Sequence, residues 1–400
     1  MVPAAQILQA MKGMKTLRSG RNRRKWIYVL LLIGLLGLSG CGSPSSASVE
    51  MSSQTELVKT GSMELQYAEN FAVDYYEDGY KMLTTLPDSK RYLIVPEGQP
   101  VPRGLDEDVS ILQEPLQNIY LVASGVMDMF ASVDAVDQIR FSGQKQENWY
   151  IQTAKDAMAA GDMIYAGKYS KPDYELLVSE GCDLAIENRM ITHSPEVVEM
   201  LQSFDIPVMI EYSSYEQHPL GKVEWVKFFG ALTGKEAEAE EAFAEQTEIL
   251  EKVESGEKTG KTIAFFYVTS NGLIQVRQST DYIPKLIELA GGRYIFEDLE
   301  DSGSGRSTLN MQVEDFYAGA RDADILIYNS SIDGGVTTLD ELIGKCNILK
   351  DFKAVQEGQV YCTTNDMYQQ SMAIGYLLQD MHTVLTDDDT AKLRYLFLLQ

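Results

Sequence analysis

Residues 219–254 read PLGKVEWVKFFGALTGKEAEAEEAFAEQTEILEKVE and contain two consecutive helix patterns. The first begins at Pro219 and has one thick apolar stripe with the i, i+3, i+4, i+7 spacing of a helix. This stripe consists of Trp225, Phe228, Phe229 and Leu232. The second pattern has a thinner stripe, and its other faces are mostly glutamate. Its stripe consists of Ala239, Phe243, Leu250 and Val253. We therefore expect the first helix to be buried along its stripe and the second to be mostly solvated.

The second helix is predicted to connect two halves of the chain. At 1.5 Å per residue, a helix of roughly 20 residues is about 30 Å long. Short β-branched strands alternate with helices on both sides of it, which is typical of α/β units. We predict an N-terminal α/β lobe at 63–234, a connecting helix at 235–256 and a C-terminal α/β lobe at 257–400. Both lobes would be doubly wound and Rossmann-like, with the ligand cleft between them. The alternative is one large domain that carries this helix on its surface.

The first 40 residues have the pattern of an export signal. A basic stretch precedes an apolar run of 13 residues, Trp26 to Leu38, and a run this short suits a signal peptide better than a spanning helix. Leu38-Ser39-Gly40-Cys41 follows and resembles a bacterial lipobox. That resemblance implies cleavage before Cys41 and lipidation of its thiol; the alternative is a chance apolar segment that ends in cysteine. Two or more acyl chains would anchor the protein stably to the cell membrane on the extracytoplasmic side. Residues 41–62 are predicted to be a flexible tether.

The charge balance excludes some partners. The chain has 34 basic and 59 acidic residues, a net charge of −25, and removal of the basic leader makes the balance still more negative. This argues against nucleic acid or an anionic lipid surface as a partner. After Cys41 the only cysteines are Cys182, Cys346 and Cys362. An odd number favours buried free thiols over a disulfide framework.

Strand and helix patterns alternate through both predicted lobes. The segment 63–96 favours a small antiparallel meander, with runs at 65–68, 71–76, 80–85 and 91–95. A buried strand then leads through Ser124 into a helix that is predicted to continue to about Ile139. Further strands are predicted at 182–187 and 206–212, each preceded by a helix. In the C-terminal lobe, strands are predicted at 261–268, 323–328 and 358–362. Because ligands bind beyond the carboxyl ends of strands in such sheets, the loops after Ala123, Glu187 and Tyr212 are the candidate cleft loops.

No catalytic motif accompanies this pattern. The sequence has no H-E-x-x-H, C-x-x-C, G-x-S-x-G, Walker A or G-x-G-x-x-G motif. Its histidines, His193, His218 and His382, are far apart and do not have the spacing of metal ligands. We therefore expect no enzyme activity, no metal site and no cofactor.

The predicted loops are instead rich in aromatic and basic residues, which suits a large planar or anionic ligand held by stacking and guanidinium contacts. With 22 tyrosines in the chain, any single one could equally serve packing. The candidate ligand-binding residues are Ser124, Trp149, Tyr150, Tyr169, Arg189, Tyr215, Arg277, Tyr282, Arg306 and Tyr368.

Five phrases, in order, resemble the substrate-binding lipoproteins of ABC importers, in the branch that binds iron complexes and cobalamin. The phrases are YSKPDYELL at 169–177, HPLGKVEW at 218–225, DYIPKLIELAGG at 281–292, DILIY at 324–328 and FKAV at 352–355. The resemblance extends from about Met63 to the C-terminus. It implies two lobes bridged by one long helix that close only slightly around a ligand. Members of this family often have arginine at the position of Lys222.

The same resemblance implies a partner surface. In the family, one glutamate on an outer helix of each lobe docks onto arginines of the membrane permease. The matching positions are Glu175, in PDYELL, and Glu314, in MQVEDF. Considered without the resemblance, each would be an ordinary solvated acid.

The prediction is a monomeric, non-catalytic receptor that captures a ferric siderophore, haem or a corrinoid and delivers it to an ABC permease. The family resemblance does not choose among these ligands. An enzyme on a two-lobed α/β scaffold, metal-dependent or chelatase-like, is one alternative. A surface lipoprotein that senses a small ligand is another.

Overall fold

The computed structural model describes residues 57–299, 307–330, 335–387 and 392–400. The predicted signal peptide, Cys41, most of the predicted tether and Arg306 lie outside these residues. Residues 54–400 belong to one unit by their contacts. Among the described residues, no helix is both long enough and apolar enough to cross a membrane.

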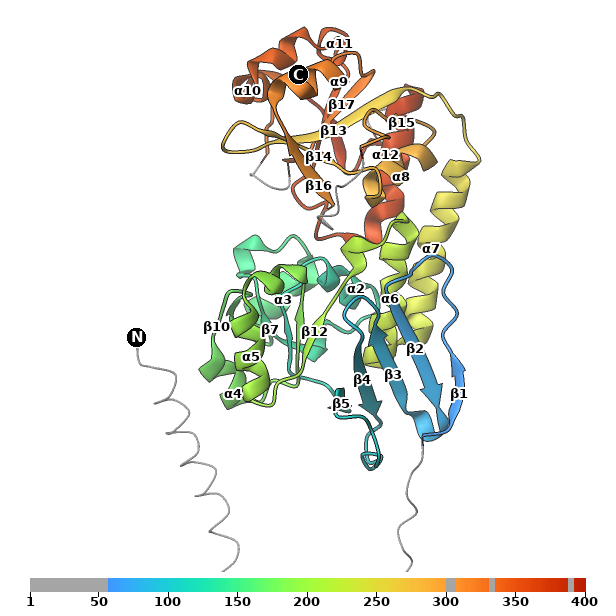
Figure 1. Ribbon diagram of the computed structural model, residues 1–400, viewed down its shortest axis with the longest axis vertical. Helices are drawn as coiled ribbons and strands as arrows, with labels where there is room; N and C mark the ends of the chain where they lie inside the picture. Colours follow the sequence, from blue (N-terminus) through green and yellow to red (C-terminus); the bar gives the residue numbers. More distant parts are fainter. Residues whose placement is uncertain (1–56, 300–306, 331–334, 388–391) are drawn as a thin grey trace, which may run out of the picture. The chain divides into compact units, whose positions relative to one another are not determined.

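A five-stranded sheet occupies the beginning of this unit (Figure 1). Its strands, in pairing order, are β1 (Lys59–Ser62), β2 (Phe71–Tyr76), β3 (Lys81–Thr85), β4 (Lys90–Val95) and β5 (Val109–Gln113). β2, β3 and β4 pair antiparallel, as predicted for the runs at 71–76, 80–85 and 91–95. β1 also pairs antiparallel, but it lies at the end of the segment predicted to be a flexible tether, and β5 adds a parallel strand that was not predicted. The predicted strand at 65–68 does not form. Backbone N–H groups of this segment donate to the carboxylate of Glu224 instead of to a neighbouring strand.

The N-terminal lobe has a sheet of five parallel strands in the order β12-β11-β6-β7-β8. These strands are β6 (Ile119–Leu121), β7 (Ile139–Ser142), β8 (Ile164–Tyr165), β11 (Leu184–Glu187) and β12 (Val208–Ile210). The lobe also contains the short hairpin β9 (Gly167–Lys168) and β10 (Lys171–Pro172), and the helices α2 (Val126–Ser132), α3 (Gln152–Ala160), α4 (Tyr174–Glu180) and α5 (Pro195–Ser203). The helix predicted to reach Ile139 ends at Ser132. Asp134, with φ of 53°, lies in the turn that follows, and Ile139 begins β7.

The stretch quoted first forms α6 (Pro219–Thr233) and α7 (Glu236–Glu254). Every residue of α6 from Pro219 to Leu232 is buried, so the helix is enclosed on all sides rather than along one stripe. The five-stranded sheet, α2 and α7 all contact it. On α7 the predicted stripe is buried, and this helix packs against both α6 and α12 (Ile374–Thr386) of the C-terminal lobe. Two α/β lobes joined by one long helix are therefore confirmed.

The C-terminal lobe has a mixed sheet in the order β16-β14-β13-β17-β18-β19, with β15 paired to β13. Its strands are β13 (Thr262–Val268), β14 (Ile274–Arg277), β15 (Arg293–Tyr294), β16 (Thr308–Met311), β17 (Ile325–Tyr328), β18 (Val360–Thr363) and β19 (Leu396–Leu398). Its helices are α8 (Tyr282–Leu289), α9 (Val313–Ala320), α10 (Leu339–Lys345), α11 (Lys353–Gln356) and α12 (Ile374–Thr386). The parallel strands β13, β17 and β18 were predicted, whereas the antiparallel strands β14, β16 and β19 were not.

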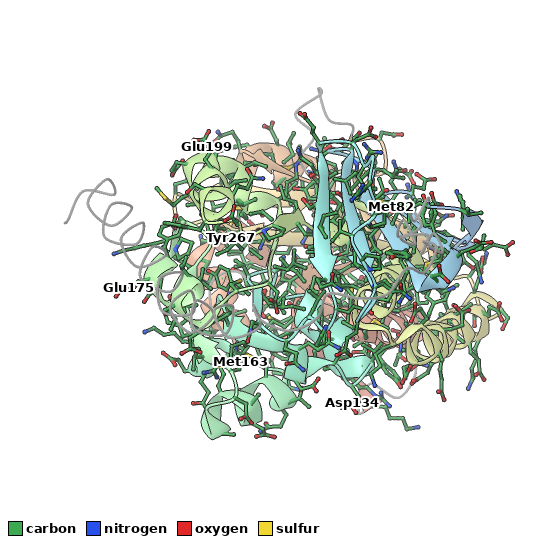
Figure 2. The ribbon with its side chains drawn as sticks, turned by 90° about the horizontal axis from the view of Figure 1, so that it is seen from below. Met82, Asp134, Met163, Glu175, Glu199 and Tyr267 are labelled. Carbon is green, nitrogen blue, oxygen red and sulfur yellow. The ribbon has the colours of Figure 1, made fainter. Side chains whose placement is uncertain are left out.

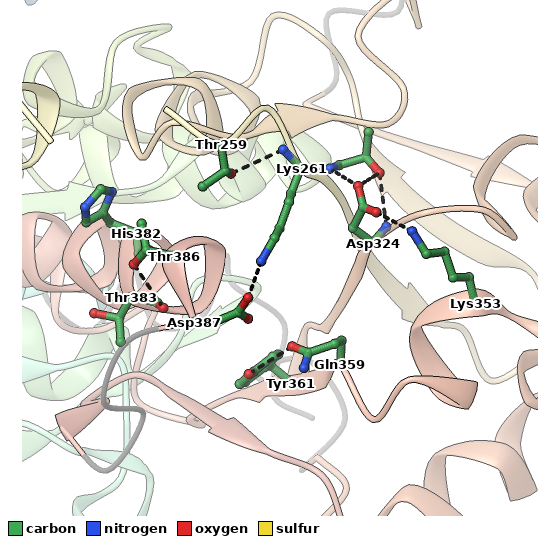
Figure 3. A network of polar contacts seen from close by, with 11 residues as sticks. Thr259, Lys261, Asp324, Lys353, Gln359, Tyr361, His382, Thr383, Thr386 and Asp387 are labelled. Atoms are coloured by element: carbon green, nitrogen blue, oxygen red, sulfur yellow. Dashed lines mark hydrogen bonds and ion pairs between the residues drawn. The ribbon is translucent and has the colours of Figure 1, made fainter. Parts of the chain in front are cut away.

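Asp324 joins the beginnings of two strands in this lobe (Figure 3). Its carboxylate accepts hydrogen bonds from the backbone N–H of Thr262 at 2.7 Å and from Lys353 Nζ at 2.6 Å. Burial alone would raise the pKa of Asp324, but these bonds outweigh it and hold the pKa below its ordinary value. Two of the five phrases, 324–328 and 352–355, therefore contribute to the packing of the lobe.

The apolar core has separate and shared parts. One cluster covers the outer face of the N-terminal sheet and another belongs to the C-terminal lobe. A third is continuous from the five-stranded sheet through α6 and α7 to α8 and α12. Because protein interiors are closely packed, a core shared by both lobes resists large rotation of one lobe against the other.

Candidate functional site

A cavity of about 490 Å³ lies beyond the carboxyl ends of β6, β11 and β12. The three predicted cleft loops all contribute to it, and α6 and the segment before α12 complete its wall. It is lined by Ala123, Ser124, Gly125, Asn188, Arg189, Met190, Thr192, His193, Glu211, Ser213, Ser214, Tyr215, Lys222, Tyr368 and Ser371. Residues from both lobes and from α6 thus meet at one place.

The two lobes approach closely beside this cavity. A Cβ atom added to Gly125 would lie 3.0 Å from Ser371 Oγ and 3.2 Å from the carbonyl oxygen of Tyr368. Only glycine allows this approach without a shift of the neighbouring chain. Nearby, Asp128 of α2 accepts a hydrogen bond from the backbone N–H of Met372 at 2.7 Å. Burial raises the pKa of Asp128 to about 6.

A buried cluster of charged and phenolic groups lies next to the cavity. Arg277 is 8% exposed, ion-pairs with Asp281 at 3.4 Å and donates a hydrogen bond to the phenol oxygen of Tyr368. Asn329 Nδ2 donates to the same oxygen at 2.7 Å. Burial raises the pKa of Tyr368 to about 12. Tyr368 is therefore a neutral phenol that is held from two sides.

Two further charged groups shape the wall. The guanidinium of Arg189 lies over the ring of Tyr215, 4.5 Å from its centre, a cation–π contact. The carboxylate of Glu211 accepts hydrogen bonds from the backbone N–H and the hydroxyl of Ser213, at 2.9 and 2.6 Å. Burial raises the pKa of Glu211 above its ordinary value. The wall therefore has aromatic, basic and acidic parts.

Four of the predicted ligand residues line this cavity, namely Ser124, Arg189, Tyr215 and Tyr368. Arg277 does not line the cavity but donates a hydrogen bond to Tyr368, which does. Tyr282 is 4% exposed, and its ring faces the ammonium of Lys222. Their predicted role in ligand binding stays a prediction.

The other candidates that the structure describes lie elsewhere. Trp149 is 1% exposed in the core, where its Nε1 donates to Ser142 Oγ at 3.0 Å. Tyr169 packs against the cluster on the outer face of the N-terminal sheet. Tyr150 is exposed, and its backbone N–H donates to Gln369 of the C-terminal segment at 2.8 Å. None of these three lines the cavity.

Sequence reasoning did not predict Lys222, Glu211 or Ser371 as lining residues. A signal for Lys222 was present, because it is a cation in a helix that has only two other charged residues, Glu224 and Lys227. No comparable signal marks Ser371, since its place depends on how the segment before α12 crosses towards α2.

A second cavity, of about 1090 Å³, opens at the opposite ends of the N-terminal strands. Six acidic residues and one arginine are among its lining residues, and none of the predicted ligand residues is. It lacks the aromatic and basic wall of the smaller cavity. Among the described residues, no group of three or more His, Cys, Asp or Glu side chains could hold a metal ion. The smaller cavity is therefore the candidate site.

Glu187, the last residue of β11, gives a testable pH dependence. It is fully buried, and neither carboxylate oxygen has a hydrogen-bond partner within the described part of the chain. Burial raises its pKa from 4.5 to about 8. Between these values the folded protein keeps a proton that the unfolded chain has lost. The stability that the neutral carboxyl contributes is thus fully present below the lower value and is lost as the pH rises to the higher one.

We therefore expect Glu187→Gln to unfold like the wild type at about pH 5 and to be more stable by about 2 to 4 kcal/mol at about pH 9. Urea unfolding at both pH values measures this difference. Glu199→Gln, on the exposed side of α5, is the control and should change stability at neither pH. Equal stability of Glu187→Gln and the wild type at the higher pH would contradict an ionised, buried carboxylate.

Comparison with known proteins identifies a family that has this fold. A family model described as periplasmic binding protein matches residues 122–367. Two proteins of Methanocaldococcus jannaschii that are named uncharacterized lipoproteins are 24% and 23% identical to the chain. These matches cover 89% and 86% of this chain and 92% and 90% of the relatives.

Solved structures share the fold at lower identity. A possible iron-binding (periplasmic solute-binding) protein from Staphylococcus epidermidis has 17% identity and a TM-score of 0.53, over 67% of this chain and 98% of that one. The periplasmic haem-binding protein HutB of Vibrio cholerae has 14% identity and a TM-score of 0.53, with the same coverage. A Fe3+-hydroxamate transport protein from Saccharomonospora viridis has 16% identity and a TM-score of 0.53, over 68% and 93% of the two chains. Because the family model matches more than half of its residues, the chain belongs to the periplasmic binding protein family.

Proposed function

We propose that this protein is the substrate-binding lipoprotein of an ABC importer, and that it captures an iron complex or a corrinoid without changing it chemically. The observation that supports this most is the cavity that loops of the N-terminal lobe, α6 and the segment 368–371 enclose together. A ligand there would touch lobes at 63–234 and 257–400, on either side of the helix at 235–256. The protein would act as a monomer.

The ligand class is supported by the matched proteins. Those with the same fold include an iron-binding protein, a haem-binding protein and a Fe3+-hydroxamate transport protein. The aromatic and basic wall suits such ligands, because planar rings stack on tyrosine and anionic groups bind to arginine or lysine. Arg189 and Tyr215 would provide these contacts on one side of the ligand.

Cys41 is the proposed anchor. Cleavage before it would leave an acylated N-terminal cysteine on a short tether, and two matched relatives are themselves named lipoproteins. The body of the protein would then remain close to the outer side of the cell membrane, within reach of a permease.

Glu175 and Glu314 are the proposed contacts with that permease. Each is the second residue of its helix, α4 or α9, and each is exposed. The two helices occupy matching places in the lobes. α4 precedes β11, which pairs parallel with β6, and α9 precedes β17, which pairs parallel with β13. Among the described residues, neither glutamate forms an ion pair, so both are available to arginines of a partner.

We expect at least one of four probes to bind to the mature protein with Kd of about 1 μM or below, about −8 kcal/mol. The probes are haem, cobalamin, a ferric trihydroxamate and ferric citrate. Calorimetric titration, together with the absorbance of each complex, measures the affinity. Arg189→Ala should weaken binding by about tenfold, as the loss of one charged contact predicts. Arg293→Ala, an exposed arginine paired with Glu297, is the matched control. No binding of any probe would reject the ligand class.

A further inference from the structure

Lys222 is a buried cation for which the described residues provide no hydrogen-bond acceptor. Lys222 is 4% exposed and lines the cavity. Its Nζ lies 4.7 Å from the centre of the Tyr282 ring, which compensates part of the cost of burying a charge. Within the part of the chain that the structure describes, this ammonium has no hydrogen-bond or ion-pair partner. Because buried donors in native proteins are almost always satisfied, a partner from outside the chain is expected.

Two hydroxyl groups that line the same cavity also lack a hydrogen-bond acceptor among the described residues. The phenol oxygen of Tyr368 accepts hydrogen bonds from Arg277 and Asn329, which leaves its own O–H to donate elsewhere. Burial keeps this phenol neutral by raising its pKa to about 12. Ser371 is 2% exposed, and its Oγ has no hydrogen-bond partner among the described residues. Lys222, Tyr368 and Ser371 all line the same cavity, so three donors lack an acceptor there.

The charges around these donors fit a single negative group. Glu211 is the one carboxylate among the described residues of the cavity wall, and it accepts hydrogen bonds from the backbone N–H and the hydroxyl of Ser213. It partly offsets Lys222 without touching it. Arg189 adds a second cation to the wall. Arg277 and Asp281 lie behind Tyr368 and neutralise each other.

We propose that Lys222, Tyr368 and Ser371 form a subsite for one carboxylate group of the captured ligand, and that this subsite favours carboxylate-bearing complexes over neutral ones. This inference rests on the proposed function for the identity of the whole ligand. The carboxylate could belong to a porphyrin side chain or to a citrate-type chelator. Both have the same planar pair of oxygens, which can accept hydrogen bonds from an ammonium and a hydroxyl at once.

The first experiment uses a carboxylate without iron. Citrate should raise the midpoint of thermal unfolding of the wild-type protein, because a ligand that binds only the folded state stabilises it. Lys222→Met should abolish this rise, and Ser371→Ala should reduce it. Lys285→Met, which removes a partly exposed lysine of α8 that does not line the cavity, is the matched control and should leave the rise intact. The result with citrate does not depend on which iron complex the protein binds.

The second experiment compares paired ligands that differ in their carboxylates. Haem is compared with its dimethyl ester, and ferric citrate with a neutral ferric trihydroxamate. Wild-type protein should prefer the carboxylate-bearing member of the bound pair by about 10- to 100-fold, the range expected for a charge-assisted hydrogen bond. Lys222→Met should remove this preference, and Lys222→Arg should keep most of it. Ser371→Ala, which removes only a hydroxyl, tests the same subsite should Lys222→Met fold poorly.

The outcomes separate the two proposals. If citrate acts through Lys222 but no iron complex or corrinoid binds, the subsite stands and the proposed transport ligand is wrong. If an iron complex binds with equal affinity to wild type, Lys222→Met and Ser371→Ala, the proposed function stands and the subsite is overturned. The absence of any effect of citrate, together with equal affinity for acid and ester, also overturns it.

Discussion

Replacing Glu224 with alanine is expected to lower the free energy of unfolding by about 3 to 5 kcal/mol, the range observed when one partner of a buried charged network is removed. Glu224 is fully buried on α6, and its carboxylate accepts hydrogen bonds from three consecutive backbone N–H groups. The donors are Gln66 at 2.9 Å, Tyr67 at 2.8 Å and Ala68 at 2.9 Å. Without this acceptor, the segment that enters the five-stranded sheet loses these three hydrogen bonds to α6, although Tyr67 still stacks on His218 at the start of the helix.

Urea unfolding measures the expected loss, and hydrogen exchange locates it. The amides of residues 66–68 should exchange faster in Glu224→Ala than in the wild type, because their acceptor is gone. Glu224→Gln keeps one acceptor oxygen and should lose about half as much stability. Glu248→Ala, on the exposed face of α7, is the control and should change stability by less than about 0.5 kcal/mol. A loss below about 1 kcal/mol for Glu224→Ala would show that the segment is held mainly by apolar packing.

The helix α6 shows which features a sequence pattern predicts and which it misses. The stripe of Trp225, Phe228, Phe229 and Leu232 correctly predicted a buried helix. It did not predict that Glu224 and Lys227 are buried as well. Their burial depends on partners distant in sequence, since Glu224 holds residues 66–68 and Lys227 ion-pairs with Glu240 at 2.8 Å. A periodicity rule considers only one helix, so it cannot identify such partners.

Strand prediction failed for a related reason. The parallel strands β13, β17 and β18 are continuous apolar runs and were predicted. The antiparallel strands β14 and β16 were not, because Ile274–Arg277 and Thr308–Met311 are short and mixed in polarity. Such segments become strands only when the edge of a sheet is available for pairing. Their pairing places Arg277, at the end of β14, behind Tyr368.

The candidate site was predicted more completely at the level of loops than at the level of side chains, because only four of the ten predicted ligand residues are among the described residues that line the cavity. The rule that ligands lie beyond the carboxyl ends of strands located all three N-terminal loops of the cavity. Residue type did not separate residues of the cavity wall from residues of the core. Trp149 and Tyr215 are both aromatic and both follow strands, yet the first is 1% exposed in the core and the second 38% exposed on the cavity wall. The difference arises from the local turn, because Trp149 Nε1 bonds to Ser142 at the end of β7.

Replacing both Glu175 and Glu314 with alanine is expected to abolish uptake while leaving the affinity for ligand unchanged. Each glutamate would lose a charge-assisted bond to the permease, worth about 1.5 to 3 kcal/mol. Losing both would weaken docking on the order of 100-fold or more. Figure 2 labels Glu175 on α4 and Glu199 on the neighbouring helix α5. Neither Glu175 nor Glu314 lines the cavity, so binding of the ligand should not change.

Uptake of a labelled ligand and calorimetric titration of the purified variant measure the two quantities separately. Glu199→Ala with Asp315→Ala removes the same charge from neighbouring exposed positions and should support normal uptake. Glu175→Arg with Glu314→Arg should fail more completely than the alanine pair, since arginine would face arginine across the contact. If only one of the two positions matters, the lobes do not dock symmetrically. If neither matters, the permease recognises another surface, and the matching places of α4 and α9 follow from the shared architecture of the two lobes alone.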